Sequence, residues 1–153
     1  MKIWLALLAL LIPAAAAAGD SVSLTSKVLV ERVKPGADGK PVTVREAPGV
    51  VTPGDRLVFV LGYRNGGAEP ATGFTLTNPI PPSVAFSGTD DAGAVVSVDG
   101  GKSWGALASL KVVQADGTSR PAVAADVTHI RWSFERPIAA GSGGELSFRG
   151  VVE

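Results

Sequence analysis

Residues 53–67 read PGDRLVFVLGYRNGG, and this stretch decides the fold class. Successive side chains of an extended strand point to opposite faces. One face of residues 56–64 therefore carries only apolar and aromatic side chains, those of Leu57, Phe59, Leu61 and Tyr63. Pro-Gly-Asp precedes the run and Asn-Gly-Gly follows it, and both are turn sequences. The stretch predicts a strand with one buried face and a turn at each end.

The same punctuation recurs along the chain, which contains 19 glycines and 11 prolines. After residue 18 apolar residues do not recur at helical spacing, whereas short alternating runs do. Further strands are expected at residues 21–33, 42–46, 73–78, 94–98, 104–113, 127–134 and 145–152. Two packed antiparallel sheets are the simplest way to bury one face of each strand. The sequence predicts an all-β fold, an immunoglobulin-like antiparallel β-sandwich of about seven to nine strands, with a small barrel as the alternative.

The first 18 residues have the composition of a secretory signal peptide. Lys2 gives a positive start, residues 3–12 form an apolar run, and residues 14–18 are all alanine. The apolar run is shorter than the roughly 20 residues that span a bilayer. We expect a signal helix at residues 1–18 that is cleaved, with a retained anchor as the alternative, and a single β-sandwich domain at residues 19–153. The protein is then exported, to the periplasm or the cell exterior, where it could associate with the cell surface.

Charge and cysteine content argue against several kinds of partner and chemistry. The chain has 14 basic and 14 acidic residues, and removal of Lys2 with the signal leaves 13 against 14, a net charge of −1. This balance does not favour nucleic acid or an anionic membrane surface as a partner. Because there is no cysteine, disulfides and thiolate chemistry are excluded. Stability must come from a hydrophobic core.

No arrangement of residues predicts catalysis or a bound cofactor. His129 is the only histidine, and it lies on the polar face of its predicted strand. Asp126 is close in sequence, but no nucleophile motif accompanies the two residues. We expect an exposed strand histidine and no enzymatic activity, with a hydrolase as a remote alternative. One histidine without cysteine also argues against a zinc site.

Asp90 and Asp91 lie in a glycine-containing loop and are the candidate calcium ligands. Paired carboxylates in a loop can bind Ca²⁺, which takes six to eight oxygen ligands. The loop SGTDDAG lacks the regularly spaced acidic residues of a known calcium loop. A solvated turn is the favoured interpretation.

Residues 97–104, SVDGGKSW, form the most specific local pattern. They resemble the Asp-box hairpin of sialidase-type propellers, in which the aspartate and glycines shape a turn. A single copy argues against a propeller. We expect a tight hairpin in which the Asp99 side chain bonds the turn backbone. Trp104, with Asp99 and Lys102 beside it, is the candidate platform for a glycan ligand.

Lys27 raises the possibility of a covalent crosslink. Some bacterial surface sandwiches join a lysine of the first strand to an asparagine of the last. The last predicted strand, residues 145–152, contains no asparagine, and Asn65 and Asn78 lie in the middle of the chain. We therefore do not expect the crosslink.

Residues 50–82 resemble the "conserved repeat" domain, domain of unknown function eleven, of bacterial and archaeal envelope proteins. The matching residues are Pro53, Gly54, Asp55, Phe59, Asn65, Gly67, Thr77, Ile80 and Pro81. The stretches VSVDGGKSWG and DVTHIRWSFERPIAAGSGGELSFRG are also similar to exported single-domain members of that group. The resemblance implies an immunoglobulin-like sandwich at the cell envelope and no reaction.

These observations together predict an exported, non-catalytic module with a structural, adhesive or assembly role at the bacterial envelope. The expected partners are other envelope proteins, bound for instance by addition of a partner strand to an unpaired sheet edge. A carbohydrate-binding module that uses Trp104 is the alternative. Nucleic acid is not an expected partner, and no membrane span is expected after signal cleavage.

Overall fold

The computed structural model describes residues 21–153, so the expected signal helix at residues 1–18 lies outside the described residues. The described chain forms ten strands, and every strand pair is antiparallel. Its only helical segments are two single turns of 3-10 helix. The all-β prediction is confirmed, with ten strands instead of seven to nine.

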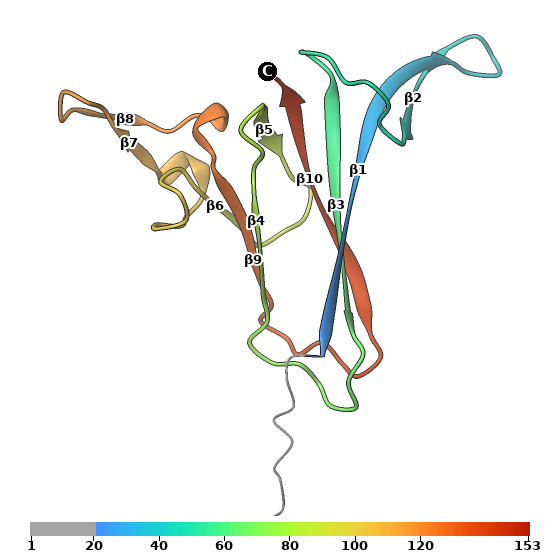
Figure 1. Cartoon of the computed structure of the whole chain (residues 1–153), viewed down its shortest axis with the longest axis vertical. Coiled ribbons are helices and arrows are strands. Elements are labelled where there is room, and N and C mark those ends of the chain that lie inside the picture. Colours follow the sequence, from blue (N-terminus) through green and yellow to red (C-terminus); the bar gives the residue numbers. More distant parts are fainter. Residues whose placement is uncertain (1–20) are drawn as a thin grey trace, which may run out of the picture.

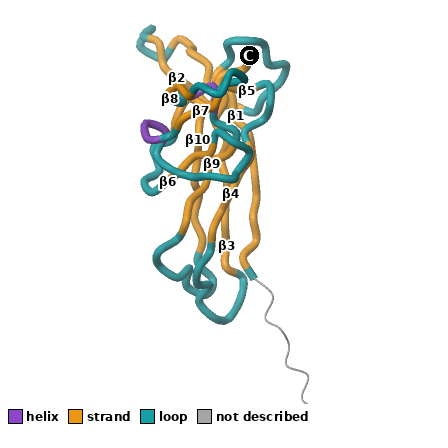
Figure 2. Tube along the Cα trace, turned by 90° about the vertical axis from the view of Figure 1, so that its left-hand side faces the viewer, coloured by secondary structure: helices purple, strands orange, loops and turns teal. Residues whose placement is uncertain are grey.

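Two sheets contain eight of the ten strands (Figure 1). The five-stranded sheet has the order β2 (Pro41–Glu46), β1 (Val22–Pro35), β3 (Arg56–Asn65), β10 (Gly143–Val152) and β5 (Val84–Gly88). The three-stranded sheet has the order β4 (Thr75–Pro79), β9 (His129–Ser133) and β6 (Ala94–Ser97). The remaining strands, β7 (Lys111–Val113) and β8 (Ser119–Pro121), form a hairpin that projects from one end. The long strands run along the length of the molecule, and loops gather at both ends (Figure 2).

One cluster of buried side chains links the two sheets. Phe148 and Ile130 have no exposed surface. Phe148 stacks on Phe59, with ring centroids 4.6 Å apart. The five-stranded sheet contributes Val30, Leu57, Phe59, Leu61, Val84, Phe86 and Phe148, and the three-stranded sheet contributes Leu76, Val96, Ile130 and Trp132. Removal of this apolar surface from water is the main stabilising contribution in a chain without disulfides.

Strand β3 is buried on both of its faces. Leu57, Phe59 and Leu61 lie in the core, as the alternating pattern predicts. Val58 and Val60 on the opposite face are buried as well. On that face, β1 and β10 place long side chains beside them in register, namely Lys27, Leu29 and Arg149. The central position of β3 accounts for its nearly continuous apolar sequence.

The segment 104–113 differs from the expected single strand. Only Lys111–Val113 is extended, and η1 (Leu107–Ser109) forms a helical turn in which the Ser109 hydroxyl donates to the Ala106 carbonyl at 2.8 Å. The small side chains of residues 105, 106 and 108 offer little to pack on a sheet. The missed strand β8 pairs with β7 across the turn at residues 114–118.

Asn65 holds one end of the molecule together. Its side chain is completely buried. Nδ2 donates to the Glu69 carbonyl at 2.8 Å and to the Ile138 carbonyl at 2.9 Å. Oδ1 accepts from the Gly67 N–H and from the Ser21 hydroxyl, both at 3.0 Å. One amide thus joins the loop after β3 to the loop before β10 and to the start of β1.

Candidate functional site

The Asp99 turn has the geometry predicted from the sequence. The carboxylate accepts from the Ser97 hydroxyl at 2.7 Å, from the Lys102 N–H at 3.0 Å, and from the Ser103 hydroxyl at 2.6 Å. These hydrogen bonds, that of the Ser103 hydroxyl foremost, hold the pKa of Asp99 well below its usual range. Val96 and Gly105 close the hairpin with two backbone bonds. The hairpin prediction is confirmed, and the carboxylate is engaged within the turn.

Trp104 lies on the outer face of the three-stranded sheet and is half-buried. Its Nε1 donates to the Gly101 carbonyl at 3.0 Å. The Arg131 guanidinium lies over the ring, 3.7 Å from its centroid, in a cation–π contact. The hairpin therefore brings together Trp104, Asp99 and Lys102, the three glycan-binding candidates, but Arg131 covers one face of the indole.

The calcium candidates Asp90 and Asp91 have different protein partners. Asp90 accepts two hydrogen bonds from the Arg149 guanidinium, which lowers the pKa of Asp90 and raises that of Arg149. Asp91 accepts from the Ser147 N–H at 2.6 Å. No group of three or more His, Cys, Asp or Glu side chains within residues 21–153 could hold a metal ion. Both carboxylates attach the loop after β5 to strand β10.

His129 is half-buried, whereas the sequence predicted an exposed side chain. The ring of Trp104 lies beside it, with centroids 6.3 Å apart, and Nδ1 is 3.0 Å from the Thr128 hydroxyl. Asp126 does not orient the imidazole, because Arg120 donates to its two oxygens at 2.6 and 2.7 Å. This ion pair lowers the pKa of Asp126 to about 2. His129 and Asp126 thus have different hydrogen-bond partners, Thr128 and Arg120 respectively.

The residues considered for a crosslink are likewise engaged elsewhere. Lys27 Nζ lies 3.3 Å from Glu145 on the outer face of the five-stranded sheet. Asn78 donates to the Pro79 carbonyl at 2.7 Å, and the buried Asn65 amide donates to the Ile138 carbonyl. In register, Lys27 is opposite Val60, five residues along β3 from Asn65.

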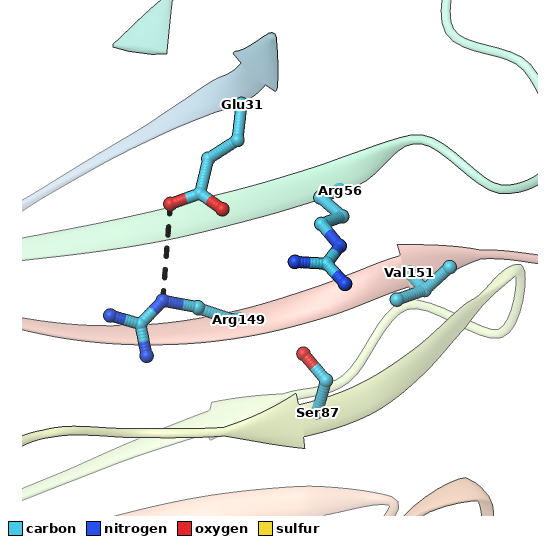
Figure 3. Close-up of a pocket in the computed structure, with 5 residues that line it drawn as sticks. All are labelled: Glu31, Arg56, Ser87, Arg149 and Val151. Carbon is cyan, nitrogen blue, oxygen red and sulfur yellow. Dashed lines mark ion pairs between the residues drawn. The ribbon is translucent and has the colours of Figure 1, made fainter. Parts of the chain in front are cut away.

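The sequence did not predict a hollow of ≈ 210 Å³ on the outer face of the five-stranded sheet (Figure 3). Arg56 and Arg149 project from neighbouring strands at this hollow, which is also lined by Glu31, Ser87 and Val151. Glu31 lies 3.9 Å from Arg149 and 3.2 Å from Arg45. The Glu31 carboxylate therefore serves two arginines, and Arg56 makes no ion pair with the described residues.

A second feature, which the sequence did not locate, is a free strand edge on β1 among residues 21–153. Strand β3 pairs with β1 over residues 22–31, whereas β2 pairs with it only from Val30 onward. The Ser21 carbonyl accepts from Gly66 on the β3 side, and Gly36 donates to Lys40 on the β2 side. Antiparallel hydrogen bonds alternate along a strand, so the even-numbered residues of β1 point away from β3. The backbone groups of residues 22, 24, 26 and 28 therefore face outward on one side. We call this side of residues 22–29 the open edge.

The open edge borders a hollow of ≈ 150 Å³ between the two sheets. Strand β4 of the three-stranded sheet forms the opposite wall, and Leu61 of β3 lies between them. The lining residues are Leu24, Thr25, Ser26, Leu61, Leu76, Thr77 and Asn78. Leu24 is 57% exposed, although it shares the inward face of β1 with the buried Val30. An apolar side chain of the inward face is thus exposed at the open edge.

No protein-family model, no curated protein and no solved structure matches the chain. The resemblance to domain of unknown function eleven therefore stays a prediction. Within residues 21–153, none of the helical segments is long and apolar enough to span a membrane.

Proposed function

We propose that this protein is an exported, non-catalytic module with an immunoglobulin-like sandwich fold, and that it binds other envelope proteins in a structural, adhesive or assembly role. The observation that carries the proposal is the open edge of β1 beside an apolar hollow. A free edge offers unpaired N–H and C=O groups to a partner strand. The hollow offers space for side chains of that strand.

The arrangement of the two sheets supports the sandwich part of the proposal. The chain passes between the sheets at β3–β4, β4–β5, β5–β6 and β9–β10, and both sheets contribute to one core. Crossings of this kind are typical of Greek-key sandwiches. The turn and strand residues of the family resemblance, among them Asp55 and Asn65, have fold-stabilising contacts here.

The contacts of the titratable side chains support a non-catalytic role. Asp99 is engaged by its own turn, Asp126 by Arg120, and Asp90 by Arg149. Carboxylates with such hydrogen bonds and ion pairs stabilise the fold and stay ionised at neutral pH. A binding role needs no free acid or base, and the open edge provides its hydrogen bonds from the backbone.

The proposal is tested by capture of partners from a bacterial envelope extract. Ser26→Pro removes an outward N–H from the open edge without removing a bond to β3, and proline is tolerated at such an edge position. Ser26→Ala changes the same side chain but keeps the N–H and is the matched control. The wild type and Ser26→Ala should retain the same envelope protein, and Ser26→Pro should lose it. Capture of that protein by all three variants alike would refute binding at this edge.

Glycan binding at Trp104 stays a second prediction. A sugar ring would stack on the indole face that Arg131 leaves free. Titration with a panel of oligosaccharides should then change the tryptophan fluorescence of the wild type but not of Trp104→Phe. No response to any member of the panel would sink this alternative.

A further inference from the structure

Two other strands of the sandwich, β10 and β6, have exposed sides that are closed by specific contacts. Strand β5 pairs only with residues 149–152 of β10, and the exposed side of β10 before them is closed at Ser147. The Ser147 N–H donates to Asp91 at 2.6 Å, and the Ser147 carbonyl accepts from the Thr89 hydroxyl at 2.6 Å. Strand β6 is four residues long and is bridged at Val96 by Gly105. Proteins protect strand edges in this way against unwanted pairing. By contrast, no strand within residues 21–153 pairs with the outward side of residues 22–29 of β1, which are eight residues or about 26 Å of strand.

The side of β1 that faces the hollow specifies apolar partner side chains. A strand added at the open edge would place alternate side chains beside Leu24 and Val28. Leu24 is 57% exposed, and Val28 packs at the margin of the core. The same partner side chains would lie over Leu61 and Leu76, which are lined up in the hollow. Covering this apolar surface favours valine, isoleucine or leucine at every second partner position.

The outer side of the open edge and of the neighbouring strand β3 carries an excess of positive charge. The fully charged side chains in residues 22–29 and 60–65 are Lys27 and Arg64. The exposed Arg64 makes no ion pair within residues 21–153. Glu145 is the carboxylate that contacts Lys27, in a pair whose two side chains are 57% and 63% exposed. Such an exposed pair is weak and leaves Lys27 able to bind another carboxylate.

From this geometry, and resting on the function proposed above, we propose that the open edge of β1 binds an extended segment of a partner protein in which apolar residues alternate with aspartate or glutamate. The backbone of the segment pairs with residues 22, 24, 26 and 28 of β1. Its apolar side chains fill the hollow against Leu24, Leu61 and Leu76. Its carboxylates lie on the outer side, next to Lys27 and near Arg64.

A defined peptide tests this pairing directly. The probe is a dye-labelled peptide about as long as the open edge, in which valine alternates with glutamate. Two control peptides are a valine–lysine alternation and a peptide with the same valines and glutamates in two blocks. Fluorescence anisotropy with the full protein should show binding of the alternating acidic peptide. The lysine peptide should bind at least about fivefold more weakly, because two exposed charge contacts become repulsive, and the block peptide should not bind.

Hydrogen exchange locates the bound peptide. The amide protons of Val22, Leu24, Ser26 and Val28 should exchange more slowly when the peptide is present, because each one gains an acceptor. Those of the odd-numbered residues between them are already bonded to β3 and should change little. Protection that appears elsewhere, with none on these four, would overturn the proposal.

Two variants separate the backbone and charge contributions. Ser26→Pro should weaken the acidic peptide about tenfold through loss of one hydrogen bond, and Ser26→Ala should not. If the proline variant does not fold, the double variant Lys27→Gln, Arg64→Gln still tests the charges, since both side chains are exposed. It should bind the valine–glutamate peptide about fivefold more weakly and remove the preference over the lysine peptide. Equal affinity of the two peptides for the wild type would overturn the acidic specificity.

The outcomes distinguish this inference from the proposed function. Edge-dependent capture of an envelope protein, combined with no binding of the valine–glutamate peptide, would leave the proposed function in place and refute the partner chemistry. A concentration-dependent dimer of the protein alone that Ser26→Pro abolishes would identify a second copy as the occupant and refute the acidic segment. Peptide binding with slowed exchange at the four even-numbered residues supports both.

Discussion

Replacing Asn65 tests whether a single buried amide holds one end of the molecule together. Asn65→Ala removes four hydrogen bonds, of 2.8 to 3.0 Å, to Glu69, Ile138, Gly67 and Ser21. At about 1 kcal/mol for each net bond, the upper figure is about 4 kcal/mol. Three of the four partners lie in surface segments where water can replace the amide. We therefore expect the free energy of unfolding to fall by about 2–3 kcal/mol.

Asn65→Asp provides a stricter version of the same test. It keeps one acceptor oxygen for Gly67 and Ser21 but turns a second oxygen toward the carbonyls of Glu69 and Ile138. At neutral pH this buried, repelled charge should destabilise the protein more than Asn65→Ala does. The difference should narrow as the pH falls and the carboxyl is protonated, because a protonated carboxyl can donate to one of the two carbonyls.

Guanidinium chloride unfolding, followed by tryptophan fluorescence, measures both effects. Asn78→Ala is the control, because that amide makes one exposed hydrogen bond to Pro79. It should change the free energy of unfolding by about 0.5 kcal/mol or less. If Asn65→Ala is no more destabilising than Asn78→Ala, the four hydrogen bonds of Asn65 contribute little to stability and the reasoning is refuted.

Three further substitutions test the core, a close backbone approach and the acid stability. Phe148→Ala should lower the free energy of unfolding by about 3–5 kcal/mol in chemical denaturation, because the ring has no exposed surface; a loss below about 1 kcal/mol would contradict its place in the core. Gly150→Ala should lower the free energy of unfolding by about 1–3 kcal/mol, because the added Cβ would lie 2.2 Å from a side-chain carbon of Val84 in β5. Gly49→Ala is the control and should leave the free energy of unfolding nearly unchanged, because its Cβ would meet nothing within 4 Å. The pKa of Asp126 is about 2 in the folded protein, below the value of roughly 3.9 in an unfolded chain. The ion pair of Asp126 with Arg120 therefore stabilises the fold above about pH 4. This contribution is lost as the pH falls toward 2. Unfolding midpoints measured between those pH values should fall less steeply for Asp126→Asn, and parallel profiles would contradict the pair's role.

The strands that the sequence predicted best are those with long alternating runs. The strand expected at residues 56–64 is β3 at Arg56–Asn65, and its inward side chains lie in the core. Strand β5 was not predicted although Val84 and Phe86 alternate with smaller residues, because the prolines before it end the preceding strand and do not indicate where the next one begins. Strand β7 lies within the strand predicted at residues 104–113, but β8 at Ser119–Pro121 was not predicted. The three residues of β8 are too few to show an alternating pattern, although Asp116-Gly117 before them is a turn sequence.

The polar contacts within short segments could be predicted, but those between distant segments could not. Asp99 bonds the backbone three and four residues ahead, so its role follows from local turn chemistry. Asp91 instead seals Ser147, 56 residues away, and no local pattern indicates that partner. A loop carboxylate can bind a cation, water or a distant backbone group, and its sequence neighbours do not decide among them.

The open edge depends on strand order, which alternation within one strand does not contain. Residues 21–33 show a regular pattern that predicts a strand, and that pattern would be the same in the middle of a sheet. Strand β2 is only six residues long and pairs from Val30 onward, so it leaves the first half of β1 without a neighbour on that side. The exposed Leu24 is therefore explained by the length of another strand. A site of this kind can be recognised only after the strand pairing is known, whereas residue types alone predict Trp104 and the paired aspartates as candidate sites.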